Sequence, residues 1–376
     1  MKRIYLSSPH LGEREMVYVK EAFDSNWIAP VGENINRFQR QLETYLGNHV
    51  EVTALSSGTA AIHLALVMLG VNSGDEVICQ SFTFAASVNP ILYQHAIPVL
   101  IDSEEDTWNM SPEHLERAIL HRERKGKKPR AIILVDLFGM PAKMNELITL
   151  AQQHEIPVIE DAAEALGSQY DGRACGSFGQ MGVLSFNGNK IITCSSGGAL
   201  VSTNHNYVQQ AKFYAGQAKE PGAFYQHSRI GYNYQLSNIL AGIGCGQMEV
   251  LDARIARRRE IKSLYRQELA DIEGISFHSE PDERFFSNDW LTVIILDTHK
   301  LKATPLQIVE TLNRQEIECR PVWNPMHRQP VFADAPYYGS GVCERIFAHG
   351  LCLPSGSNLS NEDIQRVAAA LKVALN

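Results

Sequence analysis

The chain has 376 residues, of which 44% are hydrophobic and 20% are charged, and its formal net charge is −8. This composition is typical of a globular protein long enough for one large domain and a smaller one. The acidic balance argues against a nucleic-acid-binding protein, and no uninterrupted apolar run reaches the roughly 18 residues of a membrane span.

From about residue 50, apolar runs typical of strands alternate with helical patterns. The expected strands are residues 51–56, 75–80, 97–102, 130–139, 156–162, 181–186 and 198–203, and the first helices are residues 59–70 and 89–94. Strands that alternate with helices imply parallel pairing and a layered α/β domain. In such a domain, ligands bind at the carboxyl ends of the strands.

The second half of the chain carries a different pattern. Residues 236–269 have helical spacing and many arginines, strand-like runs cover residues 290–296 and 316–323, and helical patterns cover residues 305–313 and 361–375. We therefore predict a large domain over residues 1–250, which includes an N-terminal substrate segment, and a smaller α+β domain over residues 251–376.

The first motif that carries chemistry is S-S-G-T-A at residues 56–60, between a strand and a helix. Gly58 lets the backbone approach an oxyanion, the first N–H groups of the helix point at it, and Thr59 adds a hydroxyl. A simple helix N-cap is the alternative interpretation of this motif.

The second motif is E-D-A-A-E-A at residues 160–165, after an apolar run. Asp161 lies where a parallel strand ends, and a buried carboxylate there needs a cationic partner. The protonated pyridine nitrogen of pyridoxal phosphate (PLP) is one such partner. An N-cap aspartate is an equally good interpretation of this motif alone.

The third motif is S-F-N-G-N-K at residues 185–190, a turn between two strands. A lysine amine with a lowered pKa is a nucleophile that forms a Schiff base with the PLP aldehyde, which makes Lys190 the candidate catalytic residue. Ser185 is a candidate phosphate ligand. A lone lysine is more often a solvated charge.

A phosphate turn, an aspartate and a lysine, in that order and each at a strand end, together indicate a PLP enzyme of fold type I. The expected fold is therefore α/β, like that of aspartate aminotransferase, with a mixed, mostly parallel sheet. Phe84, in S-F-T-F-A, is a candidate aromatic face for the pyridine ring, although ordinary core packing would also explain it.

Nearly the whole chain resembles the sugar-nucleotide aminotransferases of the DegT/DnrJ/EryC family. The segments that carry the resemblance are SNWIAPVG (25–32), SSGTAAIHLAL (56–66), SFTFAAS (81–87), DLFGMPA (136–142), EDAAEALGS (160–168), SFNGNKIIT (185–193), GYNYQLSNI (231–239), WNPMHRQPVF (323–332) and GLCLPSGSNLS (350–360). Several of them look most like the branch that makes UDP-N-acetylbacillosamine precursors. Perosamine synthases, which act on GDP sugars, are the nearest alternative.

The resemblance implies a role for each matching residue. Lys190 would carry PLP, Asp161 would pair with the ring nitrogen, and Glu164 would lie beside the ring hydroxyl. The phosphate would be held by Gly58, Thr59 and Ser185.

The resemblance also implies an assembly and a substrate channel. Asn233 would reach the phosphate of the neighbouring subunit, so a homodimer with shared active sites is expected. The sugar-nucleotide channel would be lined by Trp27, His227 and His327.

Two positions depart from the family pattern. The usual arginine after G-Y-N-Y is Gln235, and the usual G-E-G-G after the lysine is the run Ser195–Gly198. These departures put local substrate contacts in question more than PLP binding. Lys190 itself argues against relatives in which histidine replaces the lysine and the reaction is a dehydration.

By resemblance, the expected reaction moves an amino group from L-glutamate to C4 of a UDP-2-acetamido-2,6-dideoxy-4-keto-hexose. The alternatives are the GDP-perosamine synthase reaction on GDP-4-keto-6-deoxymannose and, in another class, a non-catalytic PLP-binding sensor. For the diphosphate of the substrate, Arg320 and Arg328 are candidates by charge alone.

The cysteines and the N-terminal residues indicate the cellular compartment in which the protein is expected. Seven cysteines without C-x-x-C spacing argue against a disulfide framework and a metal site. The first residues also lack the apolar core of a signal peptide. We therefore expect a cytoplasmic protein without a metal.

Overall fold

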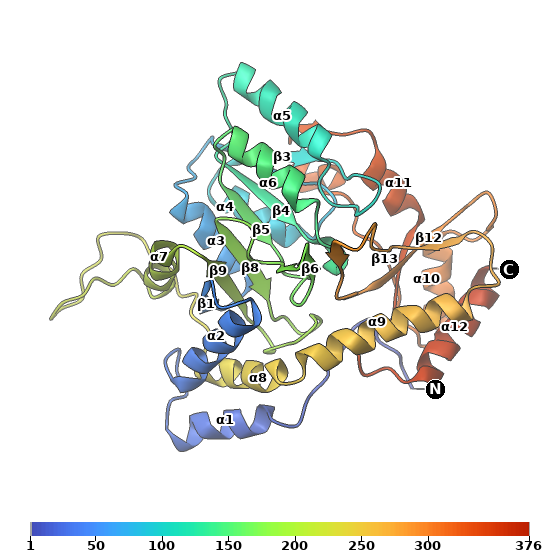
Figure 1. Cartoon of the computed structure of the whole chain (residues 1–376), viewed down its shortest axis with the longest axis horizontal. Coiled ribbons are helices and arrows are strands. Elements are labelled where there is room, and N and C mark those ends of the chain that lie inside the picture. Colours follow the sequence, from blue (N-terminus) through green and yellow to red (C-terminus); the bar gives the residue numbers. More distant parts are fainter. Residues whose placement is uncertain (1, 376) are drawn as a thin grey trace.

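A computed structural model describes residues 2–375 (Figure 1). Its centre is a sheet of eight strands, β1 (Glu51–Leu55), β2 (Glu76–Gln80), β3 (Ile97–Ile101), β4 (Ala131–Val135), β5 (Val158–Asp161), β8 (Met181–Ser185), β9 (Gly198–Ser202) and β14 (Tyr337–Tyr338). Their spatial order is β1-β9-β8-β5-β4-β2-β3-β14. Pairing is parallel from β8 to β14, whereas β9 runs antiparallel to both β1 and β8. The predicted mixed, mostly parallel sheet is confirmed.

Helices cover both faces of this sheet, because successive side chains of a strand point to opposite faces. In β2, Val77 and Cys79 pack in one apolar cluster with α3 (Gly58–Met68) and α7 (His205–Ala215). Ile78, between them, packs with α5 (Pro112–Arg124) and α6 (Met144–Gln153). Central strands buried on both faces are continuous apolar runs, which is why they could be found in the sequence.

A group of helices encloses the β1 edge of the sheet (Figure 1). It consists of α1 (Glu15–Asp24), α2 (Glu33–Tyr45) and α8 (Asn238–Met248). Phe38 and Leu42 of α2 pack in one cluster with Val52 of β1 and Leu184 of β8. A short α4 (Asn89–Tyr93) follows β2.

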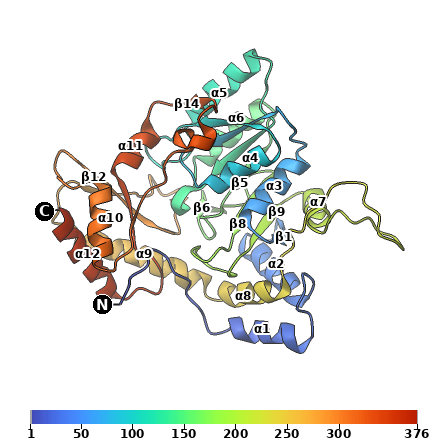
Figure 2. The ribbon, with the colours of Figure 1, turned by 180° about the vertical axis from the view of Figure 1, so that it is seen from behind.

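The long helix α9 (Leu251–Glu268) leads away from α8 to a second sheet (Figures 1 and 2). That sheet consists of β10 (Ile275–Phe277), β12 (Thr292–Leu296), β15 (Gly350–Leu353) and β13 (Arg320–Pro321), in this spatial order and all antiparallel. Packed in one apolar core with it are α9, α10 (Pro305–Arg314) and α12 (Asn361–Leu375).

Most of the expected elements of the second half are present, with two differences. The helical pattern over residues 236–269 is divided into α8 and α9, and the strand expected over residues 316–323 pairs only at β13. Proline lacks the N–H group that a longer ladder would need, which limits β13.

Strands from the second half also join the first. β14 extends the large sheet, and β11 (Phe285–Phe286) pairs with β6 (Gln169–Tyr170), which pairs with β7 (Arg173–Ala174). The α11 helix (Val342–His349) follows β14, and short 3₁₀ turns are η1 (Ala85–Ser87), η2 (Leu137–Gly139), η3 (Met326–Arg328) and η4 (Pro330–Phe332). The division at residue 250 stays a prediction.

The cysteines and the character of the helices were also compared with the expectations from the sequence. All seven cysteines are buried and none forms a disulfide. Over residues 2–375, no helix combines the length and the apolar character that crossing a membrane requires.

Candidate active site

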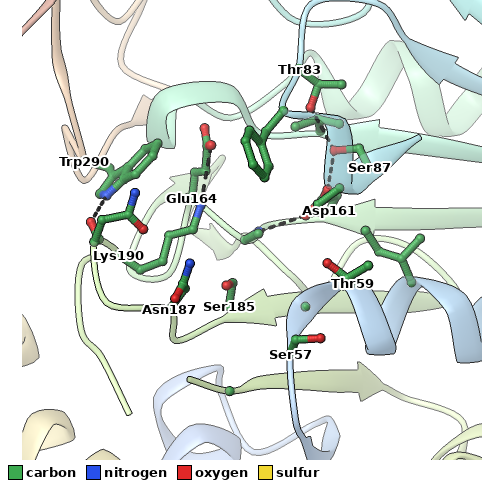
Figure 3. Close-up of a pocket in the computed structure, with 18 of the residues that line it drawn as sticks. Ser57, Thr59, Thr83, Ser87, Asp161, Glu164, Ser185, Asn187, Lys190 and Trp290 are labelled. Carbon is green, nitrogen blue, oxygen red and sulfur yellow. Dashed lines mark hydrogen bonds and ion pairs between the residues drawn. The ribbon is translucent and has the colours of Figure 1, made fainter. Parts of the chain in front are cut away.

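A cavity of about 280 Å³ lies at the carboxyl ends of β5 and β8, beside the N-terminus of α3 (Figure 3). Seven of the residues predicted from the sequence line it: Gly58, Thr59, Phe84, Asp161, Glu164, Ser185 and Lys190. The fold thus brings together three motifs that lie at residues 56–60, 160–165 and 185–190 of the sequence.

Asp161 is the last residue of β5, and the residue is 4% exposed. Oδ2 accepts a hydrogen bond of 2.7 Å from the Ser87 hydroxyl, and Oδ1 accepts one of 3.2 Å from the Ala163 N–H. Burial raises the pKa of Asp161, and the two hydrogen bonds and the Lys190 charge oppose that rise. A buried carboxylate held this way can stabilise a cation in the cavity.

The preceding carboxylate faces away from the cavity. Glu160 accepts hydrogen bonds from the backbone N–H groups of Gly176, Phe178 and Gly179. Since neighbouring strand residues point to opposite faces, only one of the two acids can serve the site. The structure assigns that place to Asp161.

Lys190 lies in the loop between β8 and β9. Its Nζ is 3.5 Å from Glu164 Oε1 and 4.3 Å from the centre of the Trp290 ring. Glu164 Oε2 accepts a hydrogen bond of 2.7 Å from the Phe138 N–H. Burial raises the pKa of Glu164, and the Lys190 charge acts against that rise. The lysine amine is therefore held between an acid and an aromatic face, largely shielded from water.

The α3 N-terminus, with Ser185 beside it, forms an anion cradle. The first N–H groups of a helix have no partner within the helix and attract an anion. Ser57 is an N-cap, since its Oγ accepts from the Ala60 N–H at 3.0 Å, which confirms the N-cap interpretation of this motif; the phosphate-binding interpretation is compatible with it and stays a prediction. A Cβ on Gly58 would lie 3.3 Å from Ser185 Cβ, and a Cβ on Gly198 would lie 2.3 Å from Gly58 N. The contact at Gly58 is tight, and the one at Gly198 leaves no room for a side chain unless the backbone moves.

Two aromatic residues form one wall. Phe84 is 54% exposed, so it is a lining residue rather than part of the core, and its ring centre is 5.6 Å from that of Trp323. Trp323 also stacks on Phe138, with ring centres 5.8 Å apart. Phe84 is thus placed to face a flat ring in the cavity.

Four predicted residues lie outside this cavity. Asn233 and Trp27 are exposed, and His227 is exposed with Nδ1 2.9 Å from the Gln217 carbonyl oxygen. His327 is engaged within the chain, with Nδ1 2.7 Å from Ser81 Oγ and Nε2 3.0 Å from Glu344 Oε1. Their roles in a substrate channel or a neighbouring site stay predictions.

The lining residues that were not singled out from the sequence include three with hydrogen-bonding side chains: Thr83, Ser87 and Trp290. The Thr83 and Ser87 hydroxyls are 2.8 Å apart, and Ser87 donates to Asp161. Both lie in the S-F-T-F-A-A-S segment already singled out for Phe84, which was a usable signal. Trp290 is the first residue of the strand-like run over residues 290–296, and nothing in that run indicated a contact with the cavity.

The two departures from the family pattern lie at different distances from the cavity. Ser196 lines it, and its Oγ donates to the Ser56 carbonyl at 3.0 Å. Gln235 is exposed and pairs with Leu55 just before the anion cradle.

The donor set matches PLP group by group. The anion cradle suits the phosphate, Phe84 suits the ring, Lys190 suits the aldehyde, and Asp161 suits the protonated ring nitrogen. A cation beside Asp161 would also remove the cost of burying that carboxylate alone. With the mixed sheet, this donor set defines a PLP-dependent enzyme of fold type I.

The chain belongs to the DegT/DnrJ/EryC1/StrS aminotransferase family, whose model matches residues 9–372. It is 51% identical over 374 residues to a Bacillus subtilis (strain 168) protein named "Putative pyridoxal phosphate-dependent aminotransferase EpsN", covering 98% of this chain and 95% of that one. It is 37% identical over 365 residues to the GDP-perosamine synthase of Escherichia coli O157:H7, covering 97% and 96%. The solved aminotransferase TlmJ from Streptoalloteichus hindustanus superposes with a TM-score of 0.90 at 27% identity, covering 100% and 99%.

Proposed function

We propose that this aminotransferase moves an amino group from L-glutamate to C4 of a UDP-2-acetamido-2,6-dideoxy-4-keto-hexose, with Lys190 as the residue that carries PLP. The observation that carries the proposal is the meeting of Lys190, Asp161 and the anion cradle in one cavity. The choice of sugar rests on the resemblance of residues 323–332 and 350–360 to the bacillosamine branch.

When bound, PLP supplies an electron-withdrawing ring that stabilises negative charge on the carbon losing its proton. The protein supplies the rest. Asp161 keeps the ring nitrogen protonated, and the Lys190 amine removes a proton from one carbon and returns it to another. Glu164 Oε1, 3.5 Å from Nζ, orients that amine. The anion cradle holds the phosphate, which anchors the ring during both half-reactions.

The second candidate substrate is GDP-4-keto-6-deoxymannose, favoured by the 37% identity to a GDP-perosamine synthase. The two sugars differ at C2, where one has an acetamido group and the other a hydroxyl. Trp323 lines the cavity, and its indole N–H is buried without a hydrogen-bond partner. An unpaired buried donor favours a substrate that brings a hydrogen-bond acceptor. A hydroxyl also accepts, and we propose that the acceptor is the carbonyl oxygen of an acetamido group, which extends further from the sugar ring.

The diphosphate of the sugar nucleotide and the two carboxylates of glutamate both need cationic partners. Among the described residues of one chain, Lys190 is the one basic residue that lines the cavity, so these partners must lie outside it. Arg320 and Arg328 are both exposed and outside the cavity. We propose them as contacts for the nucleotide end, which extends beyond the cavity.

We also propose a homodimer with shared active sites. Residues 217–235 form an arm that projects beyond α7 (Figure 1). On this arm, Phe224, Tyr225 and Ile230 are 73%, 80% and 83% exposed, which is unusual for a surface that faces only water. A second copy would cover these side chains and receive Asn233 at its phosphate.

A cytoplasmic location is part of the proposal and is supported by seven buried, unpaired cysteines, which suit a reducing compartment.

The decisive experiment compares both keto sugars with glutamate and follows the release of 2-oxoglutarate. A higher kcat/KM for the UDP-acetamido sugar supports the proposal, and a clear preference for the GDP sugar overturns the choice of substrate. Binding of PLP without turnover of any keto sugar nucleotide would favour a sensor. Borohydride treatment should fix PLP on Lys190, and attachment elsewhere would overturn its role.

For the dimer, we would mix the Lys190→Ala and Asn233→Ala variants. One site of each heterodimer would then have both residues, so random mixing should restore about a quarter of the sites. No recovery from a mixture that forms heterodimers would contradict sharing of the sites.

A further inference from the structure

Trp290 makes two separate contacts with the lysine loop (Figure 3). The face of its indole ring lies 4.3 Å from Lys190 Nζ, and its Nε1 donates a hydrogen bond of 2.7 Å to the Asn189 carbonyl oxygen. Trp290 is 1% exposed, although it comes from the segment that leads into β12 of the second sheet. One side chain thus contacts both the amine and the backbone that carries it.

The Asn189 carbonyl has a second donor. Ser7, in the N-terminal segment, donates its hydroxyl to the same oxygen at 2.8 Å. That hydroxyl in turn accepts a hydrogen bond of 3.0 Å from Arg258 of α9. Two distant segments, those of Ser7 and Trp290, therefore meet at the carbonyl that directly precedes Lys190, and α9 contacts the first of them.

Arg258 completes a closed ring of contacts, because it also donates to the Trp290 carbonyl oxygen. It is 1% exposed, and burial lowers its pKa to about 9. A buried guanidinium is costly unless it is well paired. In this ring its donors hold Trp290 and Ser7, the two residues that grip Asn189.

The Trp290 segment is anchored independently of this ring. The Asn288 side-chain amide donates to the Glu164 and Leu166 carbonyls at 3.0 and 2.9 Å, and Asn288 Oδ1 accepts from the Trp290 N–H at 2.9 Å. Asp289 forms a buried ion pair of 2.7 Å with Lys262 of α9. The indole is therefore fixed relative to both α9 and the Glu164 turn.

We propose that Trp290 is the positioning residue for Lys190, held in register by Arg258 and Ser7. A lysine side chain has several rotatable bonds, and its placement for proton transfer has an entropic cost. The indole N–H fixes the start of the side chain, and the aromatic face and Glu164 hold the amine in the protonated form that it takes after it has removed the proton. This inference rests on the proposal that Lys190 carries PLP.

The test uses Trp290→Phe, which keeps an aromatic face but loses the N–H donor, and Trp290→Leu, which loses both. The matched control is Trp108→Phe. Trp108 is 7% exposed in the same apolar cluster and stacks on His278 with ring centres 3.9 Å apart, but it does not line the cavity. The Ser7→Ala variant removes one donor to the Asn189 carbonyl and one acceptor of Arg258, and it leaves the apolar core side chains in place.

Two measurements distinguish a role of Trp290 in positioning Lys190 from a role in protein stability. The first is the rate at which PLP attaches to the apoprotein, followed by visible absorbance and confirmed on Lys190 by borohydride and mass spectrometry. The second is the division of the loss between kcat and the KM for glutamate. We expect kcat and the attachment rate to fall about tenfold in Trp290→Phe and on the order of a hundredfold in Trp290→Leu. The KM should stay within about twofold, and Ser7→Ala should lose about threefold.

The proposal is overturned if Trp290→Leu attaches PLP and turns over at wild-type rates, or if the control loses as much activity for an equal change in melting temperature. Should Trp290→Leu fail to fold, Trp290→Phe and Ser7→Ala decide, and wild-type rates in both would overturn it. Mapping of PLP to a residue other than Lys190 in the wild type is a different outcome, which contradicts the proposed function itself.

Discussion

Replacement of Ser87 by alanine should weaken the site through Asp161. Ser87 is 2% exposed, and its hydroxyl is one of two donors to that carboxylate. The same hydroxyl lies 2.8 Å from Thr83 Oγ1, which fixes its direction. The substitution therefore removes half of the hydrogen bonds that stabilise a buried negative charge.

The size of the effect follows from that count. A hydrogen bond to a charged group contributes about 1.5–3 kcal/mol, which corresponds to roughly a tenfold to hundredfold change in an equilibrium or a rate. Only the charged form of Asp161 loses this stabilisation. The pKa of Asp161, already raised by burial, should therefore rise further.

The sign of the pH dependence is then determined. At low pH Asp161 is protonated in both proteins, and the missing donor matters little. As pH rises, the wild type holds the charged form better, so the loss of stability of the Ser87→Ala apoprotein should grow with pH. With PLP bound, the acid limb of kcat/KM should move to higher pH, because Asp161 must be charged to hold the ring nitrogen proton.

The assay is urea unfolding of the apoprotein between pH 5 and 8, together with pH profiles of turnover. Ser202→Ala is the matched control, since Ser202 is 3% exposed and donates at 2.6 Å to a neutral carbonyl, that of Gln180. Its loss of stability should not depend on pH. If Ser87→Ala behaves like this control and its pH profile is unchanged, the hydroxyl does not tune Asp161 and the reasoning is wrong.

Three further predictions concern the anion cradle, the core and the response to acid. Gly198→Ala should weaken PLP binding by about 1–3 kcal/mol in titrations, because its Cβ would lie 2.3 Å from Gly58 N; unchanged affinity would contradict the tight packing. Arg122→Met should cost about 3 kcal/mol in urea unfolding yet leave kcat unchanged, because it leaves the buried Glu76 carboxylate without its bidentate partner; the double change with Glu76→Gln should recover stability. Burial lowers the pKa of His278 to about 3, so its contribution to stability is present above about pH 6.5 and is lost as pH falls toward 3. The His278→Gln variant should lose less stability over this pH range, and an equal dependence of unfolding free energy on pH in both proteins would contradict the prediction.

Much of the site could be predicted because its chemistry lies at the ends of recognisable strands. Asp161 follows an apolar run, Lys190 lies in a turn between two such runs, and Gly58 opens a helix after a third. In a parallel sheet, the carboxyl ends of the strands lie at one edge, so local patterns were enough to bring these residues together. The buried strands could likewise be predicted because they are continuous apolar runs.

The sequence could not indicate which side chains from distant segments form hydrogen bonds with these site residues. Ser87 donates to Asp161 across 74 residues of chain, and Trp290 donates to the Asn189 carbonyl across 101. The segment around Ser87 was singled out only for Phe84, and Trp290 has no local pattern that differs from ordinary packing. The antiparallel β9 and the addition of β14 to the large sheet are also invisible locally, because strand direction depends on the path of the chain between strands.

The amino-acid sequence by itself therefore determined the layered α/β class, the positions of most elements and the residues expected to react with PLP. Propensity, hydrophobic period and strand-end chemistry are local properties, which a single chain displays in order. The tertiary structure alone decided that Ser87 lies beside Asp161, and that Lys190 is held by Glu164 and Trp290. Those arrangements depend on burial and on contacts between distant segments, which arise only when the layers pack.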